Sequence, residues 1–159
     1  MEATAPSAPE TPRIMGLDVG DRRVGVAVSD AMGLTAQPVM TLVRSNRRQD
    51  MRSLLRVIRK HECTQIVVGN PLYMSGDLSP QATKAQAFAD ILREETGLPV
   101  HLWDERLTTT EAHRHLHASG VSGSNHKKMV DQVAAVLILQ GYLDAMAIKA
   151  EQQADKRIS

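Results

Sequence analysis

This 159-residue sequence has few aromatic residues, a single cysteine and almost no excess of charge of either sign. Aromatic side chains make up 3% of it, so we expect an aliphatic core. If the protein binds a nucleic acid, stacking of bases on aromatic rings is not expected to be the main contact. The single cysteine, Cys63, excludes an internal disulfide, fits a reducing compartment and is expected to be a buried packing residue. The net charge is only +1, so any binding of nucleic acid must depend on local basic patches.

Long apolar runs and targeting signals are also missing from the sequence pattern. No run suggests a membrane span, and the N-terminus lacks the basic start and apolar stretch of a signal peptide. We therefore expect a cytoplasmic protein that does not act at a membrane. Composition predicts a disordered tail over residues 1–12, a single domain over 13–149 and a polar C-terminal tail over 150–159.

Hydrophobic periodicity predicts an α/β fold. Three strands joined by short turns come first, and Pro38 in the third indicates an edge or a bulge. Crossovers through helices then lead to two further strands, which predicts a mixed five-stranded sheet with helices on both faces. The expected strands are 13–19, 24–29, 35–43, 65–69 and 99–103, and the expected helices lie around 51–58 and over 80–97, 108–120 and 127–148.

Acidic residues stand at the ends of the predicted strands and on the inner stripe of the last helix. Asp18 ends the first strand, and Asp104 and Glu105 end the fifth. Asp131 shares a helical stripe with apolar residues that should face the sheet. Carboxyl ends of parallel strands meet at one edge, so Asp18, Asp131 and either Asp104 or Glu105 are expected to cluster.

Clustered carboxylates repel one another, which raises their pKa unless a cation is bound between them. Carboxylate oxygens suit Mg²⁺ or Mn²⁺, and such ions promote phosphodiester hydrolysis. Each acid also has a structural alternative: Asp18 can cap its turn, Asp131 can complement a helix start, and Glu105 can pair with an arginine.

A family resemblance is carried by four blocks, found in the order LDVGDRRVGVAVSD, IVVGNPLYMSGDLSPQA, LPVHLWDERLTTTEA and KKMVDQVAAVLILQGYLD. Together they resemble the YqgF/RuvX family of pre-16S rRNA nucleases, which are also described as Holliday-junction-resolvase-like. The resemblance spans residues 13–145. It implies a ribonuclease-H-like fold, Mg²⁺ or Mn²⁺ as cofactor, and Asp18, Glu105 and Asp131 as catalytic, metal-binding acids. It also implies an endonuclease for 5′-end maturation of precursor 16S rRNA.

Several polar residues near these acids are candidate contacts for a nucleic-acid substrate, here precursor rRNA or a ribosomal precursor particle. Each of them can instead be an ordinary solvated residue without a role in binding. Two departures from the family pattern are Asn70, where an apolar residue is usual, and a less basic segment before Asp131. The candidates are Arg22, Arg23, Asn70, Arg106, Lys127 and Lys128.

Two further patterns allow alternative interpretations. Arginines at 48, 52, 56 and 59 form a helical stripe, which is either a solvated outer face or an RNA contact. His113 and His117 have the spacing of a zinc pair, but no HExxH motif or cysteine ligand accompanies them, so exposed histidines are expected.

The sequence leaves several functions and states open. A Holliday-junction DNA resolvase would use the same site, and the fold suits a monomer or a homodimer. An actin-like ATPase or sugar kinase also begins with an Asp-x-Gly turn and a hairpin, but it needs two domains. A ribosome-binding module without activity would be expected to lose an acid, and all three are present.

Overall fold

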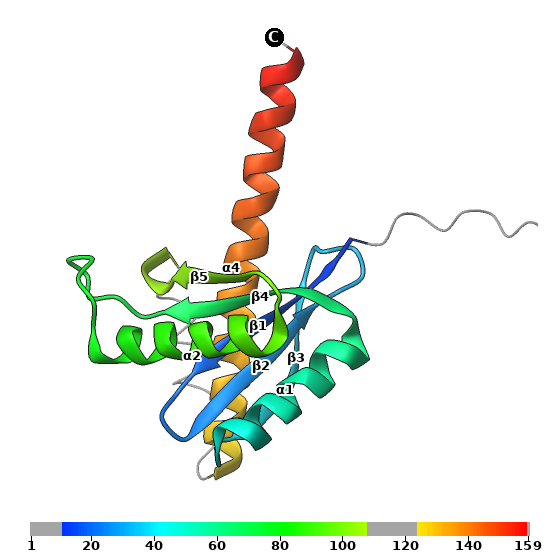
Figure 1. Cartoon of the computed structure of the whole chain (residues 1–159). Helices are drawn as coiled ribbons and strands as arrows, with labels where there is room; N and C mark the ends of the chain where they lie inside the picture. Colours follow the sequence, from blue (N-terminus) through cyan, green and yellow to red (C-terminus); the bar gives the residue numbers. More distant parts are fainter. Residues whose placement is uncertain (1–10, 108–123, 159) are drawn as a thin grey trace, which may run out of the picture.

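The computed structural model describes residues 11–107 and 124–158, in which one mixed sheet forms the centre of the fold (Figure 1). Its strands lie in the order β3-β2-β1-β4-β5. β1 pairs with β2, and β2 with β3, in antiparallel orientation, and β4 and β5 extend the sheet in parallel to β1, as predicted. The strands are β1 (Arg13–Val19), β2 (Arg23–Ser29), β3 (Ala36–Val43), β4 (Cys63–Asn70) and β5 (Val100–Asp104).

Pro38 lies in the edge strand β3, as the sequence predicted. The pairing of β2 with β3 shifts by one residue at this point, because Val26 faces Met40 and Ala27 faces Pro38. A proline cannot donate to a ladder, so an irregular edge strand is where it is tolerated. Cys63 is buried at the start of β4, and burial raises the pKa of its thiol to about 11, as suits a packing residue.

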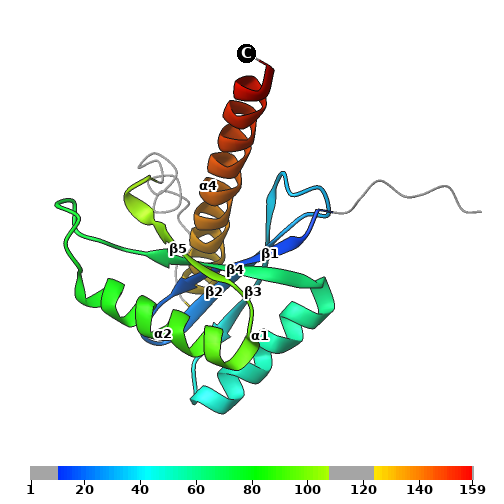
Figure 2. The same ribbon diagram turned by 45° about the horizontal axis from the view of Figure 1, so that its top comes forward.

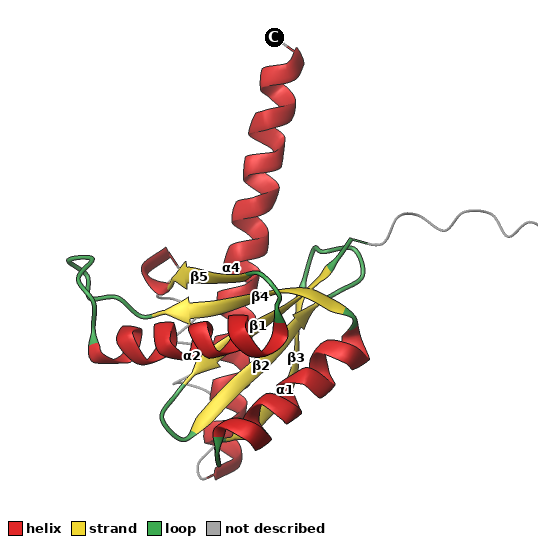
Figure 3. Cartoon of the chain, viewed as in Figure 1, coloured by secondary structure: helices red, strands yellow, loops and turns green. Residues whose placement is uncertain are grey.

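Helices cover both faces of the sheet (Figure 3). α1 (Arg47–His61) and α2 (Pro80–Thr96) pack on one face over the larger core, and α4 (Ser124–Ile158) packs on the other. α2 starts as the sequence predicted: the Ser79 side chain accepts a hydrogen bond from the Ala82 N–H, and Pro80 opens the helix. The predicted α/β fold with helices on both faces is thereby confirmed.

α4 is longer than predicted, which corrects the expected tail over residues 150–159. The helix continues to Ile158, and its last residues extend beyond the sheet (Figure 2). No glycine or proline follows Gly141, and residues 149–157 are mostly strong helix formers, so nothing ends the helix at 148. These residues are polar and exposed, as expected, but they are helical.

α4 also corrects the expectation that no stretch could span a membrane. By length and composition alone, residues 127–158 could cross a membrane: an 18-residue window within them has a mean hydropathy of 1.5, and 22% of that window is buried. Part of this apolar character belongs to the core, because Ala135, Ile138, Leu139 and Leu143 are buried against the sheet. The helix predicted over 108–120, with His113 and His117, lies outside the described residues.

Candidate active site

Three parallel strands end at one edge of the sheet, and polar residues follow each of them. Asp18 is the penultimate residue of β1, Asn70 ends β4 and Asp104 ends β5. Glu105 begins the short helix η1 (Glu105–Leu107) directly after β5. The sequence prediction that these polar residues share an edge agrees with the parallel pairing of β1 with β4 and of β4 with β5.

Strand alternation turns the Asp18 side chain toward α4. Its neighbours Leu17 and Val19 belong to the core beneath α1 and α2, and successive side chains of a strand point to opposite faces. Asp18 is paired with Gly25 of β2, so no side chain stands beside its carboxylate at that position. Asp18 therefore faces the helix that carries Asp131.

Gly25 allows α4 to approach the sheet closely. A Cβ at Gly25 would collide with the backbone carbonyl oxygen of Asp131, so only glycine fits beneath this turn of the helix. Gly69 of β4 has a similar role, because a Cβ there would lie 2.5 Å from Ile138 Cδ1 and 3.2 Å from Glu105 Cδ. The two glycines make room for the helix carrying Asp131 and for the carboxyl group of Glu105.

The acids interact electrostatically across this space. Burial, with a contribution from the charge of Asp131, raises the pKa of Asp18 to about 6. Burial also raises the pKa of Glu105 to about 7, with additional repulsion from Asp18 and Asp104. Asp18 thus interacts with both other predicted acids, and two of the three carboxyl groups are held where ionisation is disfavoured.

Asp131 is engaged by a residue that the sequence suggested for phosphate binding. The Nε of Arg23 lies 2.6 Å from Asp131 Oδ2, in a partly buried ion pair between β2 and α4. Arg23 is therefore committed to a site acid in this structure, a contact that sequence reasoning missed. No local signal could have shown it, because the two residues are far apart in the chain.

The remaining predicted contacts divide into paired and exposed residues. Arg106 forms an ion pair with Asp104 at 2.6 Å, and the charge of Asp18 affects the pKa of Glu105. The Asn70 amide oxygen accepts a hydrogen bond from Gln86 at 3.4 Å. Arg22, Lys127 and Lys128 are exposed, and none of them forms an ion pair with the part of the chain that the structure describes.

The chemistry of this cluster fits a divalent cation. Its donors are carboxylate oxygens. Burial and, to a lesser extent, repulsion raise the pKa of Asp18 and Glu105, and a bound cation would offset both effects by stabilising the ionised carboxylates. Across residues 11–107 and 124–158, no three His, Cys, Asp or Glu side chains are arranged to hold a metal as they stand. Arg23 holds Asp131 Oδ2, so a cation would bind Asp131 through Oδ1 or take the place of the guanidinium at Oδ2.

Comparison with known proteins gives consistent results. The model of the family described as "RuvX: Holliday junction resolvase" matches residues 12–145. The chain is 50% identical over 132 residues to a protein of Clostridioides difficile, covering 83% of this chain and 94% of that protein. It is 51% identical over 140 residues to one of Desulfitobacterium hafniense, covering 88% of this chain and 97% of that protein. Both relatives carry the name "Putative pre-16S rRNA nuclease".

The fold is also similar to that of a solved structure. The structure of Thermus thermophilus RuvC in complex with a Holliday junction substrate matches with a TM-score of 0.54 and 14% identity, over 86% of this chain and 96% of that one. At this identity the likeness concerns the fold alone. The ribonuclease-H-like fold that the resemblance implied is thereby confirmed.

Proposed function

The chain belongs to the RuvX family, and from that premise we propose that it is a metal-dependent endonuclease that hydrolyses phosphodiester bonds in precursor 16S rRNA. The observation that carries the proposal is the cluster of Asp18, Glu105 and Asp131 at the carboxyl edge of the sheet. A nuclease of this fold needs acids that meet beside one another. Here they come from β1, η1 and α4, and Asp18 interacts with both others.

The residues suggest a division of roles. Asp18, Glu105 and Asp131 would hold Mg²⁺ or Mn²⁺, which supplies a Lewis acid for the attack of water on a phosphate. Arg22, Lys127 and Lys128 are exposed cations near the acids and would bind phosphates on either side of the scissile bond. Asn70 and Arg106 would orient the chain of the substrate from the ends of β4 and β5.

Arg23 would serve two partners in turn. Its guanidinium neutralises the Asp131 carboxylate in this structure. The ion pair therefore lowers the repulsion between Asp131 and the nearby Asp18. Release of Asp131 to a cation would free the same guanidinium for a phosphate oxygen, which it can bind in a bidentate manner.

The rRNA substrate follows from the names of relatives at 50% and 51% identity, which cover most of their own length. A four-way DNA junction is the second candidate substrate, favoured by the description of the family and by the fold shared with RuvC. Both substrates present phosphodiesters to the same acids, so the choice depends on nucleic-acid shape.

The test compares the protein with its Asp18→Asn variant on a labelled precursor 16S rRNA fragment and on a four-way DNA junction. Each reaction contains Mg²⁺, Mn²⁺ or a chelator. We expect metal-dependent cleavage of the RNA, lost in the variant. Cleavage of the junction alone would replace the rRNA assignment by the resolvase one. Cleavage that persists in Asp18→Asn or in chelator would refute the proposed site.

A further inference from the structure

The outer face of α1 concentrates positive charge in a nearly neutral protein. Residues 47–60 hold six of the nineteen Lys and Arg residues of the chain and a single acid, Asp50. Asp50 is buried on the inner side, where its carboxylate accepts a hydrogen bond from the Ser45 N–H. We call the six cations the basic face of α1: Arg47, Arg48, Arg52, Arg56, Arg59 and Lys60.

Most of this charge is not neutralised by the protein. Arg47 forms ion pairs with Glu94 and Glu95 of α2 at 3.3 and 2.9 Å. The other five cations are exposed and form no ion pair with residues 11–107 or 124–158. Arg48, Arg52, Arg56 and Lys60 also follow one another at four-residue steps, a spacing at which like charges repel along a helix. This repulsion destabilises α1 unless an anionic partner is bound.

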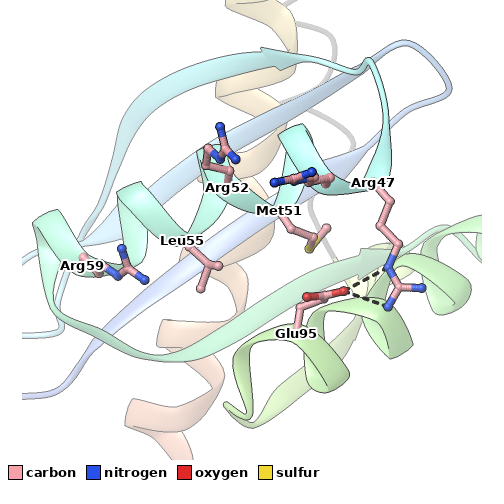
Figure 4. Close-up of a pocket in the computed structure, with 7 residues that line it drawn as sticks. Arg47, Met51, Arg52, Leu55, Arg59 and Glu95 are labelled. Atoms are coloured by element: carbon pink, nitrogen blue, oxygen red, sulfur yellow. Dashed lines mark hydrogen bonds and ion pairs between the residues drawn. The ribbon is translucent and has the colours of Figure 1, made fainter.

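The basic face surrounds a hollow. A depression of about 500 Å³ is lined by four of these arginines and Glu95, with Met51 and Leu55 between them. Figure 4 shows Arg52 and Arg59 projecting from α1 around this depression, while Arg47 reaches across to Glu95 on α2. Cationic side chains therefore border a recessed surface that is open to a ligand.

The basic face begins beside the active edge of the sheet. β3 ends at Val43, which is paired with Arg23 of β2, the residue that binds Asp131. The Arg44 N–H then donates a hydrogen bond to the carbonyl oxygen of Arg22 at 2.8 Å, and α1 starts at Arg47. A strand of nucleic acid leaving the acids past Arg22 and Arg44 would therefore meet the start of α1.

We propose that the basic face of α1 is a second binding surface for the phosphate backbone of the substrate, continuous with the active edge. This inference rests on the proposed nuclease function and adds the direction in which the substrate extends. From residue 47 to residue 60 the helix rises about 20 Å, enough to follow several phosphates along a strand. Guanidinium groups suit this partner because their planar donors match phosphate oxygens.

The experiment measures binding and cleavage separately. The variant Arg48→Gln/Arg52→Gln/Arg59→Gln is compared with the wild type and with Lys149→Gln/Lys156→Gln/Arg157→Gln, which removes equal charge from the exposed end of α4. Binding of a long, labelled RNA duplex is measured in chelator over a range of salt concentrations. Thermal unfolding of each variant checks that it is folded.

We expect the α1 variant to bind the duplex about tenfold more weakly and to lower the slope of log affinity against log salt by about 2 to 3, as the loss of about three phosphate contacts predicts. The α4 control should keep the wild-type slope. Cleavage of a short substrate that covers only the active edge should be unchanged in both.

An unchanged slope in the folded α1 variant would overturn the inference, as would a wild type that does not bind the duplex. Displacement of the duplex by poly-glutamate at equal charge concentration would assign the basic face to an acidic protein surface instead. Failure of the nuclease proposal gives a different result, because binding in chelator would still depend on α1 while cleavage failed to depend on Asp18.

Discussion

Arg23 and Asp131 are 108 residues apart in the chain, yet the Nε of one lies 2.6 Å from the Oδ2 of the other. This ion pair ties β2 to α4 at the point where the candidate metal ligands meet. A guanidinium and a metal ion cannot occupy the same carboxylate oxygen. Arg23 therefore competes with a cation for Oδ2 of Asp131.

The competition predicts the behaviour of Arg23→Gln. Without the guanidinium, both oxygens of Asp131 are available and a positive charge beside them is removed, so we expect Mn²⁺ to bind several-fold more tightly, by about 1 kcal/mol. Electron paramagnetic resonance of free Mn²⁺ measures this without any substrate. The neighbouring variant Arg22→Gln is the control, since Arg22 is exposed and forms no ion pair within the described residues. Equal Mn²⁺ affinity in both variants would show that Arg23 does not compete.

A second prediction concerns the carboxylate of Asp18. Burial and the charge of Asp131 raise its pKa from 3.8 to about 6, so the ionised form destabilises the fold. Replacing it by a neutral isostere should stabilise the metal-free protein at pH 8 by about 1–3 kcal/mol. Urea unfolding of Asp18→Asn measures this change, and the variant should have lost cleavage.

Asp30→Asn is the matched control for Asp18→Asn. Asp30 accepts a hydrogen bond from the Leu34 N–H at 2.8 Å, and such bonds hold its pKa below the ordinary value. Its replacement should lower stability at pH 8. A loss of stability in both variants would contradict the conclusion that the ionised Asp18 carboxylate destabilises the folded protein.

The pH dependence of stability follows from the same shifts. Folding raises the pKa of Asp18 from 3.8 to about 6 and that of Glu105 from 4.5 to about 7, so the folded state binds more protons than the unfolded state in this range. Stability should therefore fall as pH rises from about 4 to about 7. Chemical denaturation at a series of pH values in chelator tests this.

A divalent cation should flatten that curve. A cation stabilises the carboxylates and so lowers the pKa of both acids in the folded state. The series is repeated with saturating Mg²⁺. The gain in unfolding free energy that Mg²⁺ causes should be larger near pH 8 than near pH 5. If stability fell with pH to the same extent with and without the cation, Asp18 and Glu105 would not be its ligands.

Gly25→Ala tests the packing that positions Asp131. The added Cβ would collide with the carbonyl oxygen of Asp131, and backbone cannot yield as a flexible side chain does. We expect a loss of about 2–3 kcal/mol or more in unfolding free energy and a shift of α4 on the sheet. The control is Gly97→Asn, where nothing lies within 4 Å of an added Cβ and asparagine tolerates the positive φ of 70°.

Much of the fold could be predicted because its signals are local. The apolar, β-branched run that ends at Gly69 marked a buried strand, and Ser79 with Pro80 marked a helix start. The closeness of Asp18 and Asp131 could also be predicted, because strand ends and the inner stripe of a helix are readable from periodicity. The end of α4 was predicted too early, because no residue after Gly141 stops a helix.

The contacts inside the site could not be predicted because they depend on how elements dock. Whether Arg23 faces a phosphate or Asp131 is decided by the height of α4 above β2, which Gly25 sets. The choice between Asp104 and Glu105 depends on the turn after β5, where Arg106 pairs with Asp104. Periodicity along one segment carries no information about the contact of Arg23 with Asp131 or that of Arg106 with Asp104.

α4 follows all five strands in the chain, and this order has a consequence for biosynthesis. The strands and the acids Asp18 and Glu105 leave the ribosome before the helix that carries Asp131, and that helix packs on the face of the sheet opposite to α1 and α2. Until the segment through Leu143 has emerged, Asp131 has no packed helix to hold it and the face above β1 and β4 is uncovered. A nascent chain in which this segment has not emerged thus lacks the packed arrangement of Asp18, Glu105 and Asp131 on which the proposed hydrolysis depends.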